Sequence, residues 1–373
     1  MTALTSNRVA GSNSTDETFP SVLTPGSAIE RIVVAHGGGG ELTAALVREH
    51  FLPRLTNKQL EQLSDSAVLP WSGEKLVFTT DSYVVTPIEF PGGDIGRLAV
   101  CGTVNDLAVM GAKPVALSLG MILEEGLPVM LLDRVVASIE AACREAGVAI
   151  VTGDTKVIES RQPVGGPSDE SSMARGLFIN TAGVGTLLPG ISLDVSRISP
   201  GDAVLVSGTL AEHGLTILAA REGMEFESSL TSDAAPLNHM IASVLGAGSD
   251  IRFMRDATRG GIASVLADIC ELRDVSIVLE ETALPITPTA RHAAELFGLD
   301  PLTIANEGKV VIVTSASAAE AVVNQLRRHP LGQNAAIIGR VTAEQPPLVE
   351  LRTAAGGSRI VQRPYGEELP RIC

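Results

Sequence analysis

The sequence predicts a protein of the α/β or α+β class with two domains. Its 373 residues are more than one hydrophobic core ordinarily holds together, and they suffice for two domains of common size. In both halves of the chain, short apolar segments of strand length alternate with longer segments of helical periodicity. The turn-forming sequence Ser-Pro-Gly-Asp at 199–202 separates the two halves. We therefore expect one domain at 30–198 and a second at 199–352.

The first half alternates between helices and strands along most of its length. Apolar residues at helical spacing predict the helices, and a glycine or proline ends each of the two long ones, with Gly111 and Pro114 after one and Gly147 after the other. Continuous short apolar runs predict the strands. The expected elements are helices at 41–51, 95–110 and 131–146 and strands at 76–81, 115–121, 148–152 and 178–187.

The second half repeats this alternation, and the two ends of the chain depart from it. Residues 1–29 contain a long run of Ser, Thr, Asn and Pro, which predicts a disordered extension. Residues 353–373 contain Pro364 and Pro370, which cannot continue a helix, and we expect a flexible tail. The expected elements between them are strands at 203–207, 276–280, 310–314, 336–338 and 348–351 and helices at 215–221, 237–247, 261–270 and 289–297.

Composition and charge exclude several classes of function. Asp and Glu outnumber Lys and Arg by 43 to 28, and the formal net charge of −15 repels nucleic acid and anionic lipid. Aromatic residues make up only 3%, which argues against a platform for base stacking. Neither a signal-peptide apolar segment nor a membrane-spanning apolar run is present in the sequence. We expect a cytoplasmic protein that binds neither nucleic acid nor a membrane.

The four cysteines fall into two groups. Cys101, Cys143 and Cys270 lie in apolar runs and are expected to be buried as small hydrophobic residues. Cys373 ends the chain, where ten extended residues reach about 33 Å, so its thiol can visit a pocket and a separate partner. Arg371 favours the thiolate form nearby. The arrangement suits a swinging carrier arm, and the alternative is a chance terminal cysteine. Prenylation is excluded, because its signal needs three residues after the cysteine.

Four aspartates, Asp81, Asp106, Asp154 and Asp256, each follow an apolar strand or helix. Because strand ends meet at one edge of a sheet, these carboxylates can converge there. Carboxylate oxygens are the ligands that Mg²⁺ prefers, and Mg²⁺ can bridge the oxygens of a triphosphate. Taken singly, each aspartate is more readily explained as a helix cap or turn former. The recurrence of four favours a metal site.

Two other segments offer groups for phosphate or proton chemistry. Residues 36–40, His-Gly-Gly-Gly-Gly, precede a helix and expose backbone N–H groups, although a linker is the alternative, and His36 is either a metal ligand or a polar loop residue. No Walker A motif is present, so ATP would bind without a P-loop. Glu307 precedes an apolar strand and is either a surface turn residue or a buried general base.

Together these motifs resemble the HypE family of hydrogenase-maturation carbamoyl dehydratases, within the aminoimidazole-ribonucleotide-synthetase (PurM)-like superfamily of ATP-binding proteins. The resemblance covers residues 30–373. The aspartate motifs are shared across the superfamily, whereas the terminal Pro-Arg-Ile-Cys is close to diagnostic of the family. The segments that carry the resemblance are 36–40, 78–82, 90–96, 101–112, 153–156, 255–261, 300–302, 305–309 and 370–373.

The resemblance implies a fold and a site. In a homodimer, the N-terminal domains of two copies form a β-barrel, each C-terminal domain is an α/β unit, and ATP lies along the dimer edge. Mg·ATP is placed by the four aspartates named above, and Cys373 carries a carbamoyl group flanked by Lys156 and Glu307. Further nucleotide contacts are implied for Asn105, Thr155, Gly38 and Gly39.

The implied reaction is the ATP-dependent dehydration of an S-carbamoyl group on Cys373 to a thiocyanate. The γ-phosphate makes the carbamoyl oxygen a good leaving group, Glu307 removes the amide protons, and Lys156 neutralises developing charge. The implied partners are the carbamoyltransferase HypF, which loads Cys373, and the HypC–HypD scaffold complex, which receives the cyano group for the iron centre of [NiFe] hydrogenase.

The sequence departs from the family pattern in three places and leaves two alternatives open. Segment 159–172 is long, the N-terminal extension has no counterpart, and Ala211-Glu212 replaces the usual Gly-Asp, so Glu212 would substitute for the acid. One alternative is another ATP-using enzyme of the superfamily, such as a selenophosphate synthetase or a thiamine-monophosphate kinase. The glycine-rich loop lacks the cysteine of the former, and the latter leaves Cys373 unexplained. The other alternative is a non-catalytic carrier or scaffold.

Overall fold

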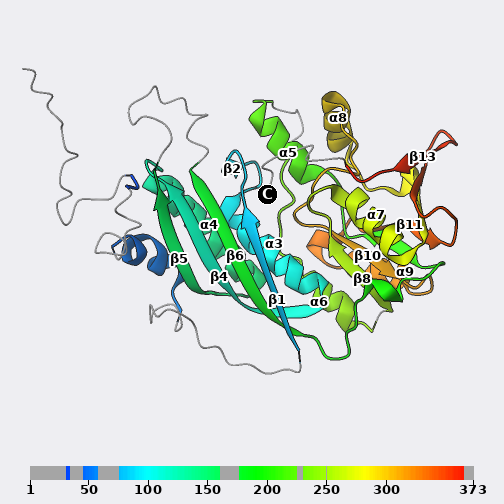
Figure 1. Ribbon diagram of the computed structural model, residues 1–373, viewed down its shortest axis with the longest axis horizontal. Helices are drawn as coiled ribbons and strands as arrows, with labels where there is room; N and C mark the ends of the chain where they lie inside the picture. Colours follow the sequence, from blue (N-terminus) through cyan, green and yellow to red (C-terminus); the bar gives the residue numbers. More distant parts are fainter. Residues whose placement is uncertain are drawn as a thin grey trace, which may run out of the picture.

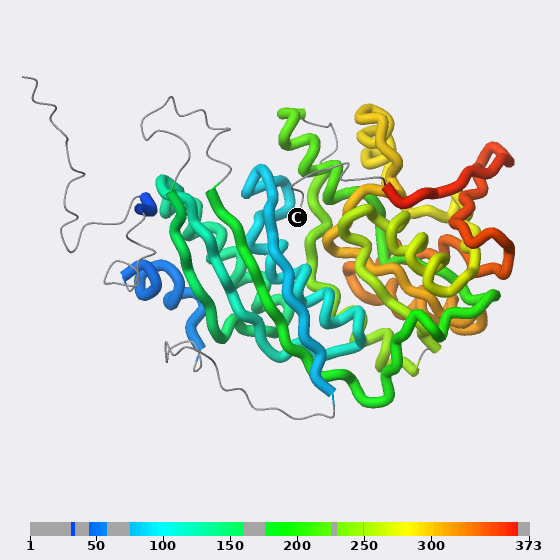
Figure 2. Tube along the Cα trace, in the orientation of Figure 1, coloured from blue at the N-terminus to red at the C-terminus, as the bar shows by residue number. Residues whose placement is uncertain are grey.

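The computed structural model describes residues 31–33, 45–57, 75–159, 176–224, 230–248 and 250–364. These residues form two domains, each built around a mixed sheet, as Figures 1 and 2 show. The predicted two-domain α/β fold is therefore confirmed, while the barrel across a dimer stays a prediction. The expectations for the extension 1–29, for residues 36–40, for the long loop after Glu159 and for Cys373 fall outside the described residues.

The first domain is a four-stranded sheet with helices on one face. Its long elements are β1 (Leu76–Tyr83), α3 (Ile95–Val109), β4 (Ala112–Glu124), α4 (Val129–Ala146), β5 (Ile150–Ile158) and β6 (Leu177–Leu187), and its short ones are η2 (Val47–Phe51), α2 (Leu52–Leu55), β2 (Glu89–Phe90) and β3 (Gly93–Asp94). The strand order is β1-β6-β4-β5, and only the pair β4–β5 is parallel. Helix α3 packs on this sheet and α4 packs on α3.

The second domain is a seven-stranded sheet with the order β13-β12-β9-β11-β7-β10-β8, in which only β12 and β9 run parallel. Helices pack against this sheet and against α3 of the first domain. The elements are η5 (Val195–Arg197), β7 (Ala203–Val206), α5 (Glu212–Arg221), α6 (Asn238–Gly246), β8 (Ile251–Asp256), α7 (Gly261–Arg273), β9 (Ser276–Glu280), η6 (Glu281–Ala283), α8 (Pro288–Phe297), β10 (Val310–Thr314), α9 (Ala319–Leu326), η7 (Pro330–Gly332), β11 (Ala336–Thr342), β12 (Val349–Arg352) and β13 (Ser358–Val361).

Helix α3 lies between the two domains. It begins after Asp94, whose carboxylate accepts a hydrogen bond from Arg97 N at 2.9 Å and so caps the helix. Gly102 lies so close to β1 that a Cβ atom there would be 2.2 Å from the hydroxyl oxygen of Tyr83. On its other sides α3 contacts α6 and β8 of the second domain. Side chains of α3 can therefore reach both domains.

The structure differs from the expected elements in three ways. Strand β5 continues through Gly153–Lys156 and β1 continues past Asp81, so these acids lie inside strands rather than after them. Strand β8 and helix α9 were not expected, because two arginines interrupt the apolar run of β8 and α9 is only 8 residues long. Strand β13 pairs with β12 inside the segment predicted as a flexible tail, so that prediction began too early in the chain.

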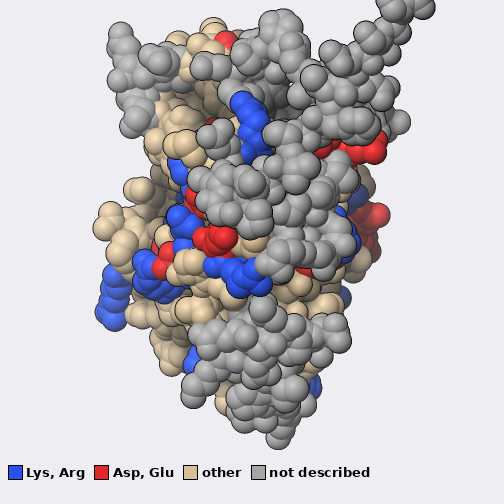
Figure 3. All heavy atoms as spheres, turned by 90° about the vertical axis from the view of Figure 1, so that its left-hand side faces the viewer, with Lys and Arg blue, Asp and Glu red and all other residues tan. Residues whose placement is uncertain are grey.

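The face in Figure 3, which is the left-hand side of Figure 1, carries Lys and Arg side chains beside Asp and Glu side chains rather than one basic patch. Within the part of the chain that the structure describes, no helix combines the length and apolar character that a membrane span requires.

Candidate functional site

Three of the four predicted aspartates belong to elements that meet at the domain junction. Asp81 lies on the face of β1 that also bears Thr79, and the Thr79 hydroxyl donates a hydrogen bond to Asp106 Oδ2 of α3 at 2.7 Å. Asp256 ends β8, which packs against α3. We call Asp81, Asp106 and Asp256 the junction carboxylates. Arg259 lies beside them, with its Nη2 atom 3.9 Å from Asp81 Oδ1.

The junction carboxylates repel one another in a partly dehydrated setting. Removal from water, followed by the negative charges of Asp106 and Asp81, raises the pKa of Asp256 to about 7. Removal from water also raises the pKa of Asp106, and the charge of Asp81 adds to this, although the hydrogen bond from Thr79 opposes it. A cation at this position would relieve the repulsion.

The junction carboxylates fit a cation that arrives with phosphate better than a metal held by protein alone. Among the described residues, no three His, Cys, Asp or Glu side chains lie close enough together to hold one ion by themselves. Mg²⁺ commonly keeps several waters and binds through one or two carboxylates plus substrate phosphates. The donor set of Asp81, Asp106 and Asp256 therefore fits Mg²⁺ bound with a polyphosphate.

The fourth aspartate lies elsewhere in the same chain. Asp154 is exposed on β5, at the opposite edge of the sheet from β1, and three strand spacings separate these strands by about 14 Å. Lys156 is also exposed, and its Nζ atom lies 3.0 Å from Asp154 Oδ1. Within one chain, Asp154, Thr155 and Lys156 therefore do not join the junction carboxylates, because β5 is the far edge strand.

Glu307 is buried at the domain junction, so the alternative of a surface turn residue is wrong. Its side chain belongs to the turn before β10, only 3% of the residue is exposed, and among the described residues its Oε1 atom has no hydrogen-bond partner. Burial raises the pKa of Glu307 well above the usual value, and the charges of Asp233 and Asp256 raise it further. Burial and the neighbouring negative charges therefore both favour the protonated form of the Glu307 carboxyl group.

Asn105, which was expected to contact the nucleotide, has its side-chain amide hydrogen-bonded to backbone groups of the protein. It is buried on α3, where its Nδ2 atom donates to Ala235 O at 3.1 Å and to Glu307 O at 3.2 Å. Its Oδ1 atom accepts a hydrogen bond from Leu237 N at 2.7 Å. The amide group thus joins two segments of backbone, the one at Ala235–Leu237 and the one that carries Glu307.

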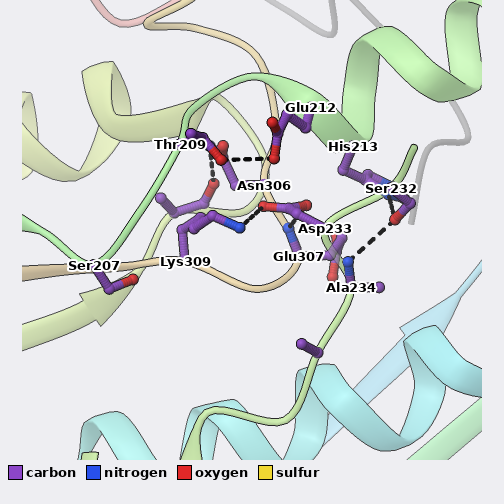
Figure 4. Close-up of polar contacts among 12 residues, drawn as sticks. Ser207, Thr209, Glu212, His213, Ser232, Asp233, Ala234, Asn306, Glu307 and Lys309 are labelled. Carbon is purple, nitrogen blue, oxygen red and sulfur yellow. Dashed lines mark hydrogen bonds and ion pairs between the residues drawn. The ribbon is translucent and has the colours of Figure 1, made fainter. Parts of the chain in front are cut away.

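A buried ion pair that no sequence motif predicted lies beside Glu307 (Figure 4). Lys309 Nζ lies 2.9 Å from Asp233 Oδ2, and the two side chains are 10% and 2% exposed. Asp233 Oδ1 accepts a hydrogen bond from Glu307 N at 3.0 Å. Burial alone would raise the pKa of Asp233, but the charge of Lys309 and this hydrogen bond outweigh it and lower the pKa. Asp233 therefore stays ionised.

A cavity of about 480 Å³ lies on the other side of this ion pair. Lys309, Asp233 and Glu212 line it from the second domain, and Gly92 and Arg97 line it from the first. Glu212, the residue that replaces the family's aspartate, accepts a hydrogen bond from the Thr209 hydroxyl at 2.7 Å, as Figure 4 shows. This hydrogen bond holds the Glu212 carboxylate beside the residues that precede α5.

The three internal cysteines are buried and free, as predicted. Burial raises the pKa of Cys143 and of Cys270 to about 12, and it raises the pKa of Cys101 further still. Such thiols are unreactive because the thiolate is the nucleophile. Of the four cysteines in the sequence, this leaves Cys373.

Comparison with known proteins agrees with this architecture. The chain matches the family models of AIR synthase related proteins, with the N-terminal domain at residues 63–187 and the C-terminal domain at residues 199–350. The carbamoyl dehydratase HypE of Rhodobacter capsulatus is 47% identical over 346 residues, which cover 92% of this chain and 98% of the relative.

Solved structures give the same result. A crystal structure of the hydrogenase maturation protein HypE in complex with ATP has a TM-score of 0.84 at 43% identity and covers 91% of this chain and 99% of its own. A HypE–HypF complex contains a chain with a TM-score of 0.72 at 42% identity, covering 86% of this chain and 100% of its own. The chain belongs to the HypE family of carbamoyl dehydratases.

Proposed function

We propose that this chain dehydrates a carbamoyl group on Cys373 to a thiocyanate, with ATP and Mg²⁺. The observation that supports this most is the junction itself, where a buried and unpaired Glu307 carboxyl group lies beside carboxylates that repel one another. The ATP-bound relative supports the nucleotide, and the elimination of the three buried thiols supports Cys373 as the carrier.

The junction carboxylates would hold the metal and, through it, the triphosphate. A bound Mg²⁺ supplies charge neutralisation for phosphoryl transfer. Asp106 accepts a hydrogen bond from Thr79, which lies two residues before Asp81 in β1, so β1 and α3 would offer the two carboxylates together. Gly38 and Gly39 remain proposed phosphate contacts through their backbone N–H groups.

The reaction balances without any further reagent. The carbamoyl oxygen takes the γ-phosphoryl group and leaves as part of phosphate, while the two amide hydrogens leave as protons and the C–N bond becomes triple. Glu307 would accept these protons as the general base. Burial, followed by the charges of Asp233, Asp256 and Asp81, raises the pKa of Glu307, and positive charge beside the junction carboxylates would lower it.

A homodimer would complete the site with the residues that one chain leaves apart. Among the described residues, β1 and β5 are the edge strands of the sheet, and its outer face exposes Phe78 (64%), Ile122 (43%) and Ile158 (43%). Closing two such sheets into a barrel would cover these side chains. We propose that Asp154, Thr155 and Lys156 of one copy serve the site of the other, with Lys156 neutralising charge on the transferring group.

Mixing two inactive variants tests this arrangement. Chains with Asp81→Asn and chains with Lys156→Ala are each expected to be inactive, but a mixed dimer would contain one intact site. Recovery of dehydration after mixing and subunit exchange is the expected result. No recovery, with mixed dimers demonstrated by native mass spectrometry, would place both residues in a site within one chain.

The partners proposed for this chain are the carbamoyltransferase HypF, which would load Cys373, and the HypC–HypD scaffold, which would accept the cyano group. The HypE–HypF complex of a relative supports the first. The test of the function is to carbamoylate Cys373, add Mg·ATP and measure the intact mass. Loss of one water from the protein, with release of ADP and phosphate, is expected. A carbamoyl group that stays intact would favour the non-catalytic carrier instead.

A further inference from the structure

Both peptide groups of Glu307 are held by buried side chains. Its N–H donates to Asp233 Oδ1 at 3.0 Å, and its carbonyl oxygen accepts from Asn105 Nδ2 at 3.2 Å. The next residue, Gly308, packs on the backbone of Asp233 so closely that a Cβ atom would lie 1.9 Å from Asp233 O. The turn that carries Glu307 therefore has one position relative to these two residues, and we call Asn105 and Asp233 the clamp.

The turn that carries Glu307 is connected on both sides to residues that neighbour the junction carboxylates. Asn105 precedes Asp106 in α3, so one clamp residue is a neighbour of a junction carboxylate. Asn306, which precedes Glu307, donates from its backbone N to Ala257 O at 2.9 Å, and Ala257 follows Asp256. The peptide groups around Glu307 are thus tied to the neighbours of two junction carboxylates.

The segment that carries Asp233 belongs to the second domain in sequence but is bound to the first. Ser232 N donates to Pro91 O at 2.9 Å, and Arg97 Nε donates to Ala234 O at 2.7 Å. A change in the relation of the two domains would therefore move Asp233, and Glu307 with it.

We propose that Asp233 is a positioning residue for the dehydration and that it acts with Asn105 by holding Glu307 at the distance from the junction carboxylates that the reaction needs. This rests on the proposed function of Glu307. Lys309 neutralises Asp233 so that a carboxylate can take this buried place. Neither side chain needs to touch the substrate.

Two double variants separate the hydrogen bond from the charge. Lys309→Met with Asp233→Asn removes the ion pair but keeps an oxygen that accepts from Glu307 N–H. Lys309→Met with Asp233→Leu removes the ion pair and the acceptor, and the leucine has the same branching at Cγ. Replacing a buried ion pair with apolar residues is often tolerated. If the leucine variant fails to fold, Asp233→Ala in the same background takes its place.

The measurements are single-turnover dehydration of the carbamoylated full chain, ATP affinity, and hydrogen exchange of the amide of Glu307. The asparagine variant is expected to dehydrate within a few-fold of the unmodified chain and to keep this amide protected. The leucine variant is expected to lose about 100-fold in dehydration rate and its amide protection, while its ATP affinity stays the same.

Equal rates or equal amide protection in the two double variants would overturn the clamp. So would a leucine variant whose ATP affinity falls as far as its rate, because that would indicate general damage to the site. If the unmodified carbamoylated chain loses no water, the proposed function fails separately. The amide exchange then still decides whether Asp233 holds Glu307.

Discussion

The domain junction and the outer face of the first sheet contain the same residue types in opposite settings. At the junction, Asp256 and Glu307 are removed from water and have raised pKa values. On the outer face, Asp154 and Lys156 form an ion pair in which both side chains are mostly exposed, at 67% and 62%. Burial, rather than the presence of an acid, therefore distinguishes the candidate site residues that a single chain brings together.

Substitution of the buried Glu307 is expected to have the largest effect, and the quantity that changes is the rate of dehydration. Glu307→Gln keeps the shape of the side chain but cannot accept a proton, so we expect dehydration to fall by about 100- to 10,000-fold while ATP still binds. Intact-mass kinetics of the carbamoylated chain measure this. Glu295→Gln, at an exposed position on α8, is the matched control. Unchanged dehydration in Glu307→Gln would remove this residue from the mechanism.

Substitution of Asp256 tests how the buried junction carboxylates affect the free energy of unfolding of the ligand-free protein. Its pKa is about 7 in the folded chain, against 3.8 for the free side chain, so the folded state holds a proton that the unfolded state has lost between these values. Stability therefore falls as pH rises from about 4 to about 7. Asp256→Asn removes this loss, and we expect it to raise the free energy of unfolding by about 2 kcal/mol at pH 8 and by little at pH 4.

Urea unfolding at the two pH values measures this change. Asp154→Asn is the control, because it makes the same substitution at an exposed position on the outer face. Although it is more stable without ligand, Asp256→Asn should lose the stabilisation that Mg·ATP gives to the unmodified chain. An equal response of the two variants would mean that the junction carboxylates do not repel one another.

The sequence predicted the central strands well and the placement of side chains poorly. Strands β9 and β10 each contain a continuous apolar run, Ile277–Leu279 and Val310–Val313, and their predicted bounds match the structure. In β5 the apolar run ends after Val151, because an edge strand alternates polar and apolar residues, so the predicted strand stopped before Asp154. Which face a strand turns to its helix depends on register, which one segment of sequence does not contain.

The buried ion pair at the junction shows a second limit. Asp233 and Lys309 are 76 positions apart in the sequence, and although Lys309 lies close to Glu307, no motif pointed to Asp233 as its partner. Only the packing of α3 against the second domain brings their segments together. The carboxylates and Glu307 could be singled out by type and position, but the residues that hold them depend on long-range contacts.

Ala211 offers a smaller test inside the second domain, at the start of α5. Its φ angle is 72° although it carries a side chain and is fully buried. An L-residue in this left-handed region costs about 1–2 kcal/mol, and glycine does not pay this cost. Ala211→Gly, which restores the residue that the family usually has, should raise the free energy of unfolding by about 1 kcal/mol. Ala220→Gly, in the same helix, should lower it by a similar amount.

The outer-face ion pair should give the smallest effect of all on the stability of one chain. Lys156→Met and Asp154→Asn, singly or together, are expected to change the free energy of unfolding by less than about 0.5 kcal/mol, because exposed ion pairs contribute little. Chemical denaturation of dilute, monomeric protein measures this. A loss of several kcal/mol would show that these residues support the fold. A negligible change, combined with lost dehydration in the dimer, would assign these residues to the site rather than to the fold, and the mixing of the two inactive variants decides which chain's site they serve.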